Sequence, residues 1–309
     1  MSRPVVLFLF GPTAVGKTGA LEALSDRPIE IISADSMQVY RGMDIGTAKP
    51  DRSLRERLPH HLIDIRDPDE QYDVGAFVTE ANRAIKAIHE RGRVSVVAGG
   101  TGYYFRHLLY GLPQAPPSDP KVREQVQREI DRMGLAEMHR TLASVDPQAA
   151  LRIHPHDAYR IGRALEIYRQ TGRGPSGFAA GGPARADVAV TSCALDRDRE
   201  ELRSRIRARV ESMFDQGLRH EVERLVDRGY GPGDPGLRAI GYREFFDAAG
   251  GLRPAEEDEA IAAEITGSTR RYAKRQRTFF RRLPRVLEIP AQEVSRVVEL
   301  VDRLCDCFV

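Results

Sequence analysis

The stretch VVLFLFGPTAVGKTGA, from Val5 to Ala20, decides the fold, because it joins an apolar run to a glycine-rich turn and then to a helical pattern. The apolar run Val5–Phe10 predicts a buried strand. The next segment fits G-x-x-x-x-G-K-[ST], a loop whose backbone N–H groups converge on phosphate oxygens at a helix start. In this pattern Lys17 reaches the terminal phosphates, and the Thr18 hydroxyl is a ligand for Mg²⁺. The predicted phosphate-binding residues are Gly11, Pro12, Thr13, Ala14, Val15, Gly16, Lys17 and Thr18.

Further apolar segments predict a parallel sheet. Ile29–Ala34, Val94–Ala98 and Val188–Leu195 have the character of buried strands, and helical patterns such as Val74–Glu90 lie between them. Strands that alternate with helices favour an α/β fold in which helices cover both faces of a parallel sheet. Such sheets bind ligands beyond the carboxyl ends of their strands, where the predicted phosphate-binding loop also lies.

Two Pro- and Gly-rich stretches, 112–120 and 172–187, divide the chain. The segment 121–171 between them is helical in pattern and holds no strand candidate. We therefore expect an α/β core that is interrupted by an all-helical insertion. The expected domains are the first part of the core at 1–115, the insertion at 116–186 and the completion of the core at 187–309.

The composition is typical of a protein from a reducing compartment. The chain has 47 basic and 45 acidic residues, so a basic surface must come from local clustering. Cys193, Cys305 and Cys307 are too few and too unevenly spaced for a disulfide framework, and we predict free thiols. No apolar run approaches the length of a membrane span or of a signal sequence. We expect a cytoplasmic monomer with no membrane contact.

An acidic residue follows the second predicted strand. Asp35 comes directly after Ala34, at the same sheet edge as the phosphate-binding loop. There it could accept a proton from a nucleophile, or it could cap the N-terminus of a helix. The third strand ends in GGTGYYF, which brings the Thr101 hydroxyl to the same edge, and this convergence favours the functional role. No strand ends in the Asp-Glu or Asp-Asp pair expected of a hydrolytic NTPase, so the phosphate need not be a γ-phosphate.

Positive charge is concentrated late in the chain, where 265–287 holds eight basic residues, Arg285 included, and no acid. If 254–283 is a helix, one side of it is a packing stripe of Tyr272, Gln276, Phe279 and Leu283. A basic stripe lies about 200° away from it. This stripe could be a solvated face, but four cations without acids suggest a nucleic-acid backbone. The basic stripe consists of Arg270, Lys274, Arg277 and Arg281.

Two other amphipathic patterns carry arginines. Segment 199–228 reads as one helix, and its Arg205 and Arg209 follow a strand closely enough to approach the phosphate. A helix of the insertion is predicted to be capped by Asp157 and ended by Gly172. The arginines that its packing stripe leaves available are Arg160, Arg163 and Arg169.

Eight motifs, which cover nearly the whole chain in a fixed order, resemble one family, the tRNA dimethylallyltransferases. The most specific motifs are DSMQVYRGMDIGTAKP at 35–50 and TRRYAKRQRTFF at 269–280. The others are GPTAVGKT at 11–18, HHLIDIRDP at 60–68, GGTGYY at 99–104, RIHPHDAYRIGRALE at 152–166, DRDREELRSRIRARVESM at 196–213 and AIGYRE at 239–244.

The resemblance implies that a dimethylallyl group moves from dimethylallyl diphosphate to the N6 amine of the adenosine next to the anticodon, in the tRNA anticodon stem-loop. Lys17, Thr18 and Mg²⁺ would stabilise charge on the departing diphosphate, which Arg209 assists in the family. Asp35 matches the family's general base, and Thr101 matches a position near the target adenosine. The residues expected to contact tRNA are Asp35, Ser36, Met37, Gln38, Thr101, Arg123, Tyr159, Arg160, Ile161, Gly162, Arg163, Arg270, Lys274 and Arg277.

The chain departs from the family in small ways. Phe279 stands where the family usually has Trp, Tyr103 stands where Leu is common, and no His/Cys cluster marks a zinc finger. One alternative is a small-molecule kinase, in which the same loop would bind ATP and Asp35 would orient a hydroxyl group. A second is a non-catalytic RNA-binding module. The separate basic helix argues against the kinase, and the poised Asp35 and Thr101 argue against the module. The loop motif alone does not exclude nucleotide binding.

Overall fold

The structure, a computed structural model, describes residues 3–178, 181–283 and 286–306. Arg285 and Cys307, which the sequence analysis includes among the basic residues and the free thiols, lie outside this part. The chain divides into two compact units, one formed by residues 1–108 and 186–309 and the other by residues 109–185. The second unit begins before residue 116, where the sequence places the insertion, because the residues on either side of its two connectors pair with each other. Leu109 O accepts a hydrogen bond from Arg185 N at 2.9 Å, and Tyr110 O accepts one from Gly182 N at 2.8 Å.

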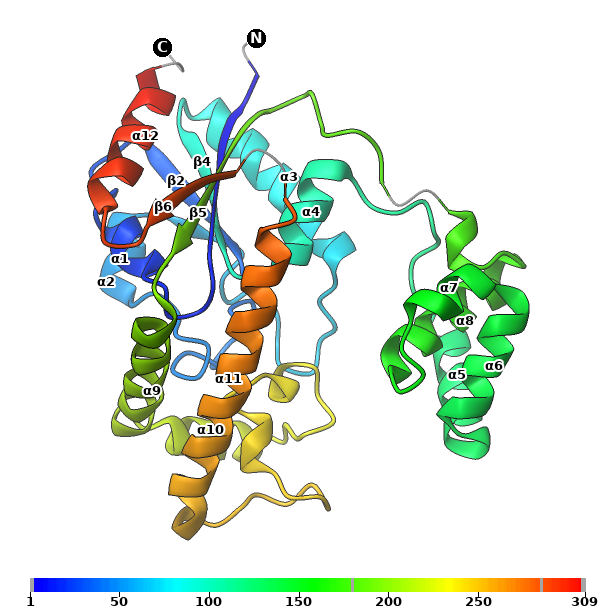
Figure 1. The fold of residues 1–309 in the computed structure, drawn as a ribbon. Coiled ribbons are helices and arrows are strands. Elements are labelled where there is room, and N and C mark those ends of the chain that lie inside the picture. Colours follow the sequence, from blue (N-terminus) through cyan, green and yellow to red (C-terminus); the bar gives the residue numbers. More distant parts are fainter. Residues whose placement is uncertain (1–2, 179–180, 284–285, 307–309) are drawn as a thin grey trace. The chain divides into compact units, whose positions relative to one another are not determined.

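The first unit is built on a sheet of six parallel strands in the order β3-β2-β4-β1-β5-β6 (Figure 1). The four predicted strands are confirmed, with the last one shifted by one residue. Two strands were not predicted: β3 has only two residues, and β6 contains Glu and Pro, so neither shows an apolar run. The strands are β1 (Val5–Phe10), β2 (Ile29–Ala34), β3 (His60–His61), β4 (Val94–Gly99), β5 (Ala189–Asp196) and β6 (Val286–Pro290).

Alternation along β1 explains why both faces of the sheet are covered. Leu7 and Leu9 belong to a core cluster that also contains residues of α1 (Lys17–Glu22) and α12 (Val294–Asp306). Phe8 and Phe10 alternate with them along the strand and pack edge-on against Phe105 of α4 (Gly102–Tyr110). Successive side chains of a strand point to opposite faces. The central strand therefore contributes to two hydrophobic layers.

The long helices of the first unit follow the predictions with two corrections. The expected single helix at 199–228 is wrong: α9 (Arg199–Asp215) ends before Gly217, whose φ of 92° no continuing helix allows, and α10 (Leu218–Asp227) starts anew. The helix expected at 254–283 is shorter, because α11 (Asp258–Phe280) follows a 3₁₀ turn at Ala255–Glu257. Two more helices are α2 (Arg52–Arg57) and α3 (Val74–Glu90).

The buried face of α11 differs from the predicted stripe. Gln276 is buried as expected, but Ala273 and Phe280 are the buried residues beside it, whereas Tyr272 and Phe279 are only partly buried. Phe280 stacks on Phe10 of the sheet at a ring-centroid distance of 4.5 Å. Because α11 packs on the sheet as well as on α9, its buried surface is not a single stripe.

The second unit is all-helical, as the sequence predicts. Its helices enclose a hydrophobic core of their own, formed by residues such as Val126, Met138, Leu142 and Ile161. The predicted cap at Asp157 is confirmed, because its carboxylate accepts a hydrogen bond from Arg160 N at 3.0 Å. The helices are α5 (Pro120–Met133), α6 (Leu135–Val145), α7 (Pro147–Arg152) and α8 (Ala158–Thr171).

Within the described ranges, no helix combines the length and the apolar character that crossing a membrane would require. The thiols of Cys193 and Cys305 are free, the first buried and the second partly buried.

Candidate active site

The phosphate-binding loop, residues 11–18, leads from the end of β1 into α1. Gly11 is needed at its start, because a Cβ atom there would lie 2.8 Å from Leu195 O on the neighbouring strand. The Lys17 ammonium group folds over the loop and donates hydrogen bonds to Gly11 O at 2.9 Å and to Pro12 O at 3.0 Å. The loop thus holds its lysine in place through its own backbone.

Arginines from the region of α9 support this loop from outside. Arg197 Nε donates to Val15 O at 3.0 Å, and Arg205 Nε donates to Ala14 O at 2.9 Å. The prediction that Arg205 approaches the phosphate-binding loop is therefore confirmed. Arg209 lies one helical turn beyond Arg205 and lines the same cavity as Lys17.

The charged forms of Lys17 and Arg209 are destabilised in this cavity. Burial, followed by the positive charge of Arg209, lowers the pKa of Lys17 from its usual value to about 8, although the negative charge of Asp35 opposes the change. Burial also lowers the pKa of Arg209. Because a bound anion would relieve both effects, the two side chains suit a phosphate group.

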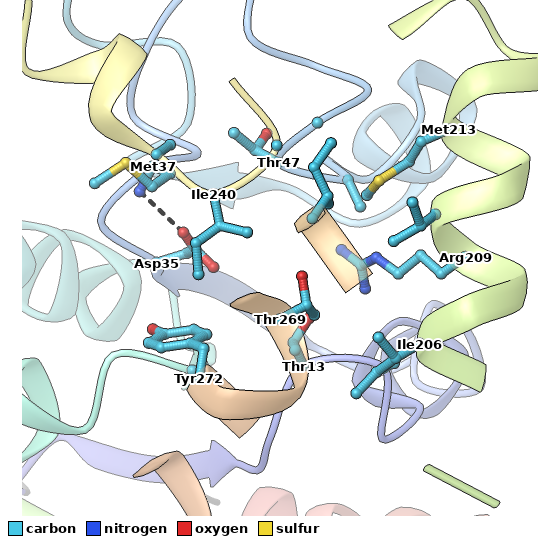
Figure 2. A pocket seen from close by; sticks show the side chains of 18 of the residues that line it. Thr13, Asp35, Met37, Thr47, Ile206, Arg209, Met213, Ile240, Thr269 and Tyr272 are labelled. Carbon is cyan, nitrogen blue, oxygen red and sulfur yellow. Dashed lines mark hydrogen bonds between the residues drawn. The ribbon is translucent and has the colours of Figure 1, made fainter. Parts of the chain in front are cut away.

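Asp35 leaves the end of β2 and points into the same cavity (Figure 2). Its Oδ1 accepts a hydrogen bond from Met37 N at 2.9 Å. The alternative of a helix cap is wrong, because the next helix, α2, begins at Arg52 and is capped by Asp51. The carboxylate therefore turns the chain locally and faces the cavity.

Thr101 lies beside Asp35, as the sequence predicts. Its Oγ1 accepts a hydrogen bond from Ser36 N at 3.2 Å, and its backbone N–H donates to Ala34 O at 3.1 Å. The end of β4 can approach this closely because residue 99 is glycine: a Cβ atom there would lie 2.2 Å from Ala34 O. The cavity lining includes Gly100 and not Thr101, whose hydroxyl orders the segment that follows Asp35.

The cavity has a volume of about 740 Å³ and is lined by charged as well as apolar side chains. Arg209 lies between Ile206 and Met213 on α9, and Ile240 lies beside Asp35 on the other side of the cavity (Figure 2). A phosphate group and a short hydrocarbon chain can both be accommodated in such a space.

Gln276 joins the two glycine-rich loops of the cavity, and the sequence did not reveal this role. Its Oε1 accepts a hydrogen bond from Thr13 N at 2.9 Å, and its Nε2 donates to Gly100 O at 2.8 Å. The feature of the sequence that could have indicated this role is the amide side chain of Gln276 in an otherwise largely apolar stripe of the helix. Tyr272 lies one turn earlier on α11, and burial raises its pKa to about 12, so the phenol keeps its proton at neutral pH.

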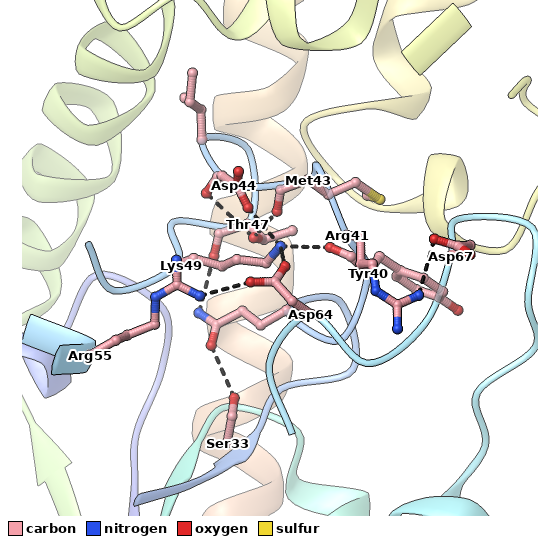
Figure 3. A network of polar contacts seen from close by, with 12 residues as sticks. Ser33, Tyr40, Arg41, Met43, Asp44, Thr47, Lys49, Arg55, Asp64 and Asp67 are labelled. Carbon is pink, nitrogen blue, oxygen red and sulfur yellow. Dashed lines mark hydrogen bonds and ion pairs between the residues drawn. The ribbon is translucent and has the colours of Figure 1, made fainter. Parts of the chain in front are cut away.

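A network of polar contacts orders the segment that follows Asp35 (Figure 3). Gln38 accepts a hydrogen bond from Ser33 Oγ at 3.0 Å, and its amide nitrogen lies 3.3 Å from Thr47 O and from Ala48 O. Lys49 binds Asp64 at 2.5 Å within the same network. Because Ser36, Met37 and Gln38 line the cavity, this network fixes one of its walls.

Glu221 of α10 is a second residue that the sequence analysis missed. Its carboxylate accepts hydrogen bonds from the backbone N–H groups of Asp44, Ile45 and Gly46, at distances from 2.9 to 3.2 Å. The hydroxyl of Tyr242 donates to it as well, at 2.6 Å. The feature of the sequence that could have indicated this role is the position of Glu221, on the apolar face of an amphipathic helix.

The expected tRNA-contact residues of the second unit differ in exposure. Arg123, Tyr159 and Arg160 are exposed on α5 and α8. Ile161 has no exposed surface and packs in the core of that unit, because it occupies the apolar stripe of α8. Gly162 is partly buried. The arginines predicted to be available on α8 are only partly so: Arg163 pairs with Glu166 at 2.9 Å, and Arg169 pairs with Glu129.

The basic residues of α11 line a groove between α9 and α11. Arg270 and Lys274 face this groove, and Arg277 faces it while pairing with Asp196 at 3.0 Å. The basic stripe is therefore next to a surface depression and is not a flat solvated face.

The side-chain oxygen atoms of the cavity could serve as ligands for Mg²⁺. The Thr18 residue is exposed next to Lys17, and the Asp35 carboxylate lines the same cavity. Hydroxyl and carboxylate oxygens are ligands that this hard cation accepts, together with phosphate oxygens.

Comparisons with known proteins agree with this architecture. The family model described as IPP transferase matches residues 38–283. A tRNA dimethylallyltransferase 2 from Geotalea uraniireducens is 47% identical over 277 residues, which cover 89% of this chain and 88% of that protein. A tRNA dimethylallyltransferase from Nitrosococcus oceani is 43% identical over 302 residues, with 96% and 94% covered.

Solved structures show the same fold. The tRNA isopentenylpyrophosphate transferase from Bacillus halodurans has a TM-score of 0.70 at 34% identity and covers 99% of this chain and 98% of its own. A eukaryotic dimethylallyltransferase acting on tRNA has a TM-score of 0.76 at 28% identity, with 95% of this chain and 75% of that chain covered. The family model and the relatives each span most of the sequence, and the chain belongs to the IPP transferase family.

Proposed function

We propose that the protein transfers a dimethylallyl group from dimethylallyl diphosphate to N6 of the adenosine 3′-adjacent to the anticodon of tRNA and releases diphosphate. The observation that carries this proposal is the cavity in which the phosphate-binding loop, Arg209 and Asp35 meet. Cations at one side suit a leaving diphosphate, and a carboxylate at the other side suits an amine that must lose a proton.

The reaction breaks the C1–O bond of the donor and forms a bond between C1 and N6. Lys17 and Arg209 stabilise the negative charge that grows on the departing diphosphate. Magnesium, held by the Thr18 hydroxyl and by phosphate oxygens, would add positive charge at the same group. Asp35 accepts the proton of N6, because the lone pair of this amine is delocalised into the ring and makes it a weak nucleophile.

The target base must leave its stack to enter the cavity. Anticodon loops are single-stranded, so the cost of extruding a base from them is small. Ser36, Met37 and Gln38 line the cavity, and we propose that they meet the extruded adenosine. Thr101 lies next to them and would act near the adenosine through its hydrogen bond with Ser36 N. Arg270, Lys274 and Arg277 would contact the tRNA backbone, together with Arg123 and the segment 159–163 of the insertion at 116–186. Ile161 would contribute to this segment through packing.

One assay tests the proposal. Labelled dimethylallyl diphosphate, Mg²⁺ and unmodified tRNA are mixed with the protein, and the expected result is label on the RNA. A parallel reaction with labelled ATP and candidate small acceptors tests the kinase alternative, which the names of the relatives do not favour. Label on a small acceptor, with none on RNA, would overturn the proposal.

The compartment in which the enzyme works can be inferred from its proposed substrate. Because tRNA carries the acceptor adenosine, we infer a cytoplasmic enzyme, and we expect it to act as a monomer. Light scattering of the purified protein at assay concentration tests the second expectation.

A further inference from the structure

A groove of about 1090 Å³ lies between α9 and α11, beside the cavity of the proposed active site. Of the 14 lining residues in the described part of the chain, eight are Arg or Lys and one, Glu200, is acidic. The chain as a whole has a net charge of only +2, so this groove is a local concentration of positive charge. The cationic lining residues are Arg199, Arg203, Arg207, Arg270, Arg271, Lys274, Arg277 and Arg281.

The wall formed by α9 is independent of the stripe on α11. Arg199, Arg203 and Arg207 are spaced four residues apart, so they share one face of α9, and all three are exposed. Arg205 and Arg209 of the same helix line the cavity instead. Helix α9 therefore has one basic face toward the phosphate-binding loop and another toward the groove.

Few of these charges are neutralised inside the protein. Arg203 pairs with Glu200 at 2.6 Å, in a contact that is exposed to solvent and therefore weak. Within the described ranges, Arg199 and Arg207 make no ion pair. The Nε atom of Arg270 is buried and has no hydrogen-bond partner there either. Such a concentration of charge repels itself and favours an anionic occupant.

The rest of the lining indicates which anion fits. The apolar lining residues are Leu202, Ile206 and Ala273, and none of the described lining residues is aromatic. Bases that bind single-stranded sites stack on aromatic rings, so this groove suits phosphates and not bases. Ile206 lines both the groove and the cavity, so the two hollows adjoin at this residue.

We propose that the groove between α9 and α11 binds the sugar–phosphate backbone of the RNA substrate, and that Arg199, Arg203 and Arg207 supply phosphate contacts from α9. This inference rests on the proposed function and adds a second wall to the RNA interface. It predicts binding that depends strongly on salt and does not depend on the base sequence in the groove.

The test uses the full chain and fluorescently labelled, unmodified tRNA, with affinity measured by anisotropy at several KCl concentrations. The variant Arg199→Gln/Arg203→Gln/Arg207→Gln removes the α9 wall only. Each lost phosphate contact lowers the slope of log K against log salt by roughly 0.7 to 0.9, so we expect a slope shallower by about 2 to 3. Because the three side chains are exposed, the variant should unfold at the wild-type temperature.

The matched control is Arg83→Gln/Lys86→Gln/Arg303→Gln, which removes the same charge from exposed sites outside the groove. We expect this control to keep the wild-type slope. Equal slopes for both variants would show an effect of net charge alone and overturn the proposal. Displacement of tRNA by excess ATP from the wild type but not from the α9 variant would also overturn it, by assigning the groove to a nucleotide. Prenyl transfer by the wild type at saturating tRNA tests the proposed function separately.

Discussion

Asp35 is the residue on which the proposed chemistry depends. Its place at the end of β2 follows from the sheet, and its contact with Met37 N fixes one carboxylate oxygen while the side chain faces the cavity. A carboxylate held in this way can take a proton without reorganising its surroundings.

Replacing Asp35 with Asn tests this role while preserving the shape of the side chain. We expect the single-turnover rate of prenyl transfer to fall by about 10² to 10⁴, because the amide cannot accept the proton. The affinity for tRNA should stay within twofold of wild type. Asp69→Asn, at an exposed position, serves as the control. A variant that binds tRNA poorly but turns over at the normal rate would contradict the assignment of Asp35 as base.

Lys17 should impose a pH dependence on donor binding. Its pKa is lowered to about 8, so the ammonium form that attracts diphosphate predominates below this pH, is half present at it and is lost as the pH rises through it. We expect the loss of this ammonium form to increase the Kd for dimethylallyl diphosphate as the pH rises above about 8, by up to about tenfold per pH unit. Equilibrium dialysis with labelled donor measures this. Lys17→Arg should remove the change, because guanidinium keeps its proton over this range.

Sequence reasoning found the residues whose roles depend on local patterns and missed those whose partners are distant. Asp35 and Thr101 directly follow strands, and Lys17 follows β1 through a recognisable loop motif, so a sheet prediction brings all three together. Gln276 and Glu221 act on loops that are more than 170 residues away in the chain. Nothing local distinguishes such a residue from an ordinary helix position, apart from its polarity on a packed face.

At the level of elements, α10 stabilises a loop that belongs to another part of the core. Glu221 gathers three consecutive backbone N–H groups and the Tyr242 hydroxyl, and the loop so held contributes Gly46, Thr47 and Ala48 to the cavity. A buried carboxylate with four donors replaces the water that these groups would otherwise bind.

Replacing Glu221 with Gln should therefore be costly. The amide presents an NH₂ group where only donors surround it, and each buried donor left without an acceptor costs about 1 to 3 kcal/mol. We expect the free energy of unfolding to fall by at least about 3 kcal/mol in urea titrations. We also expect the protein to bind dimethylallyl diphosphate more weakly. Glu223→Gln, on the same helix and partly exposed, should change stability by less than about 0.5 kcal/mol. Equal stability of the two variants would refute the positioning role.

Periodicity predicted the central elements well and the edges poorly. Buried strands such as β1 consist of continuous apolar residues, whereas β3 has only two residues and β6 has five, of which only Ile289 is buried. The break between α9 and α10 at Gly217 was hidden because the apolar spacing of 199–228 continues through it. Tertiary packing, and not propensity, decides such boundaries.

At the level of the whole molecule, the insertion joins the core through two connectors that lie together. Leu109 and Tyr110 accept backbone hydrogen bonds from Arg185 and Gly182. The helices between them have their own hydrophobic core. The first unit should therefore fold without the second.

Replacing residues 112–181 with a two-residue Gly-Ser link tests this independence. We expect cooperative unfolding and donor affinity close to those of the full chain, because the phosphate-binding loop, Arg209 and Asp35 all belong to the first unit. Affinity for tRNA should drop, since the exposed Tyr159 and Arg160 are removed. Thermal unfolding and the two binding assays measure these effects. A shortened protein that fails to fold would disprove the independence of the first unit. One that binds tRNA as well as the full chain would disprove a role of the second unit in tRNA binding.

The paired connectors have a consequence for evolution and engineering. An insertion whose two ends lie close together can be replaced by another, because the core only has to bridge the same short distance between the two connection points. Helical insertions from relatives could be grafted at 110 and 182 to change which RNAs are chosen, while the chemistry stays with the host.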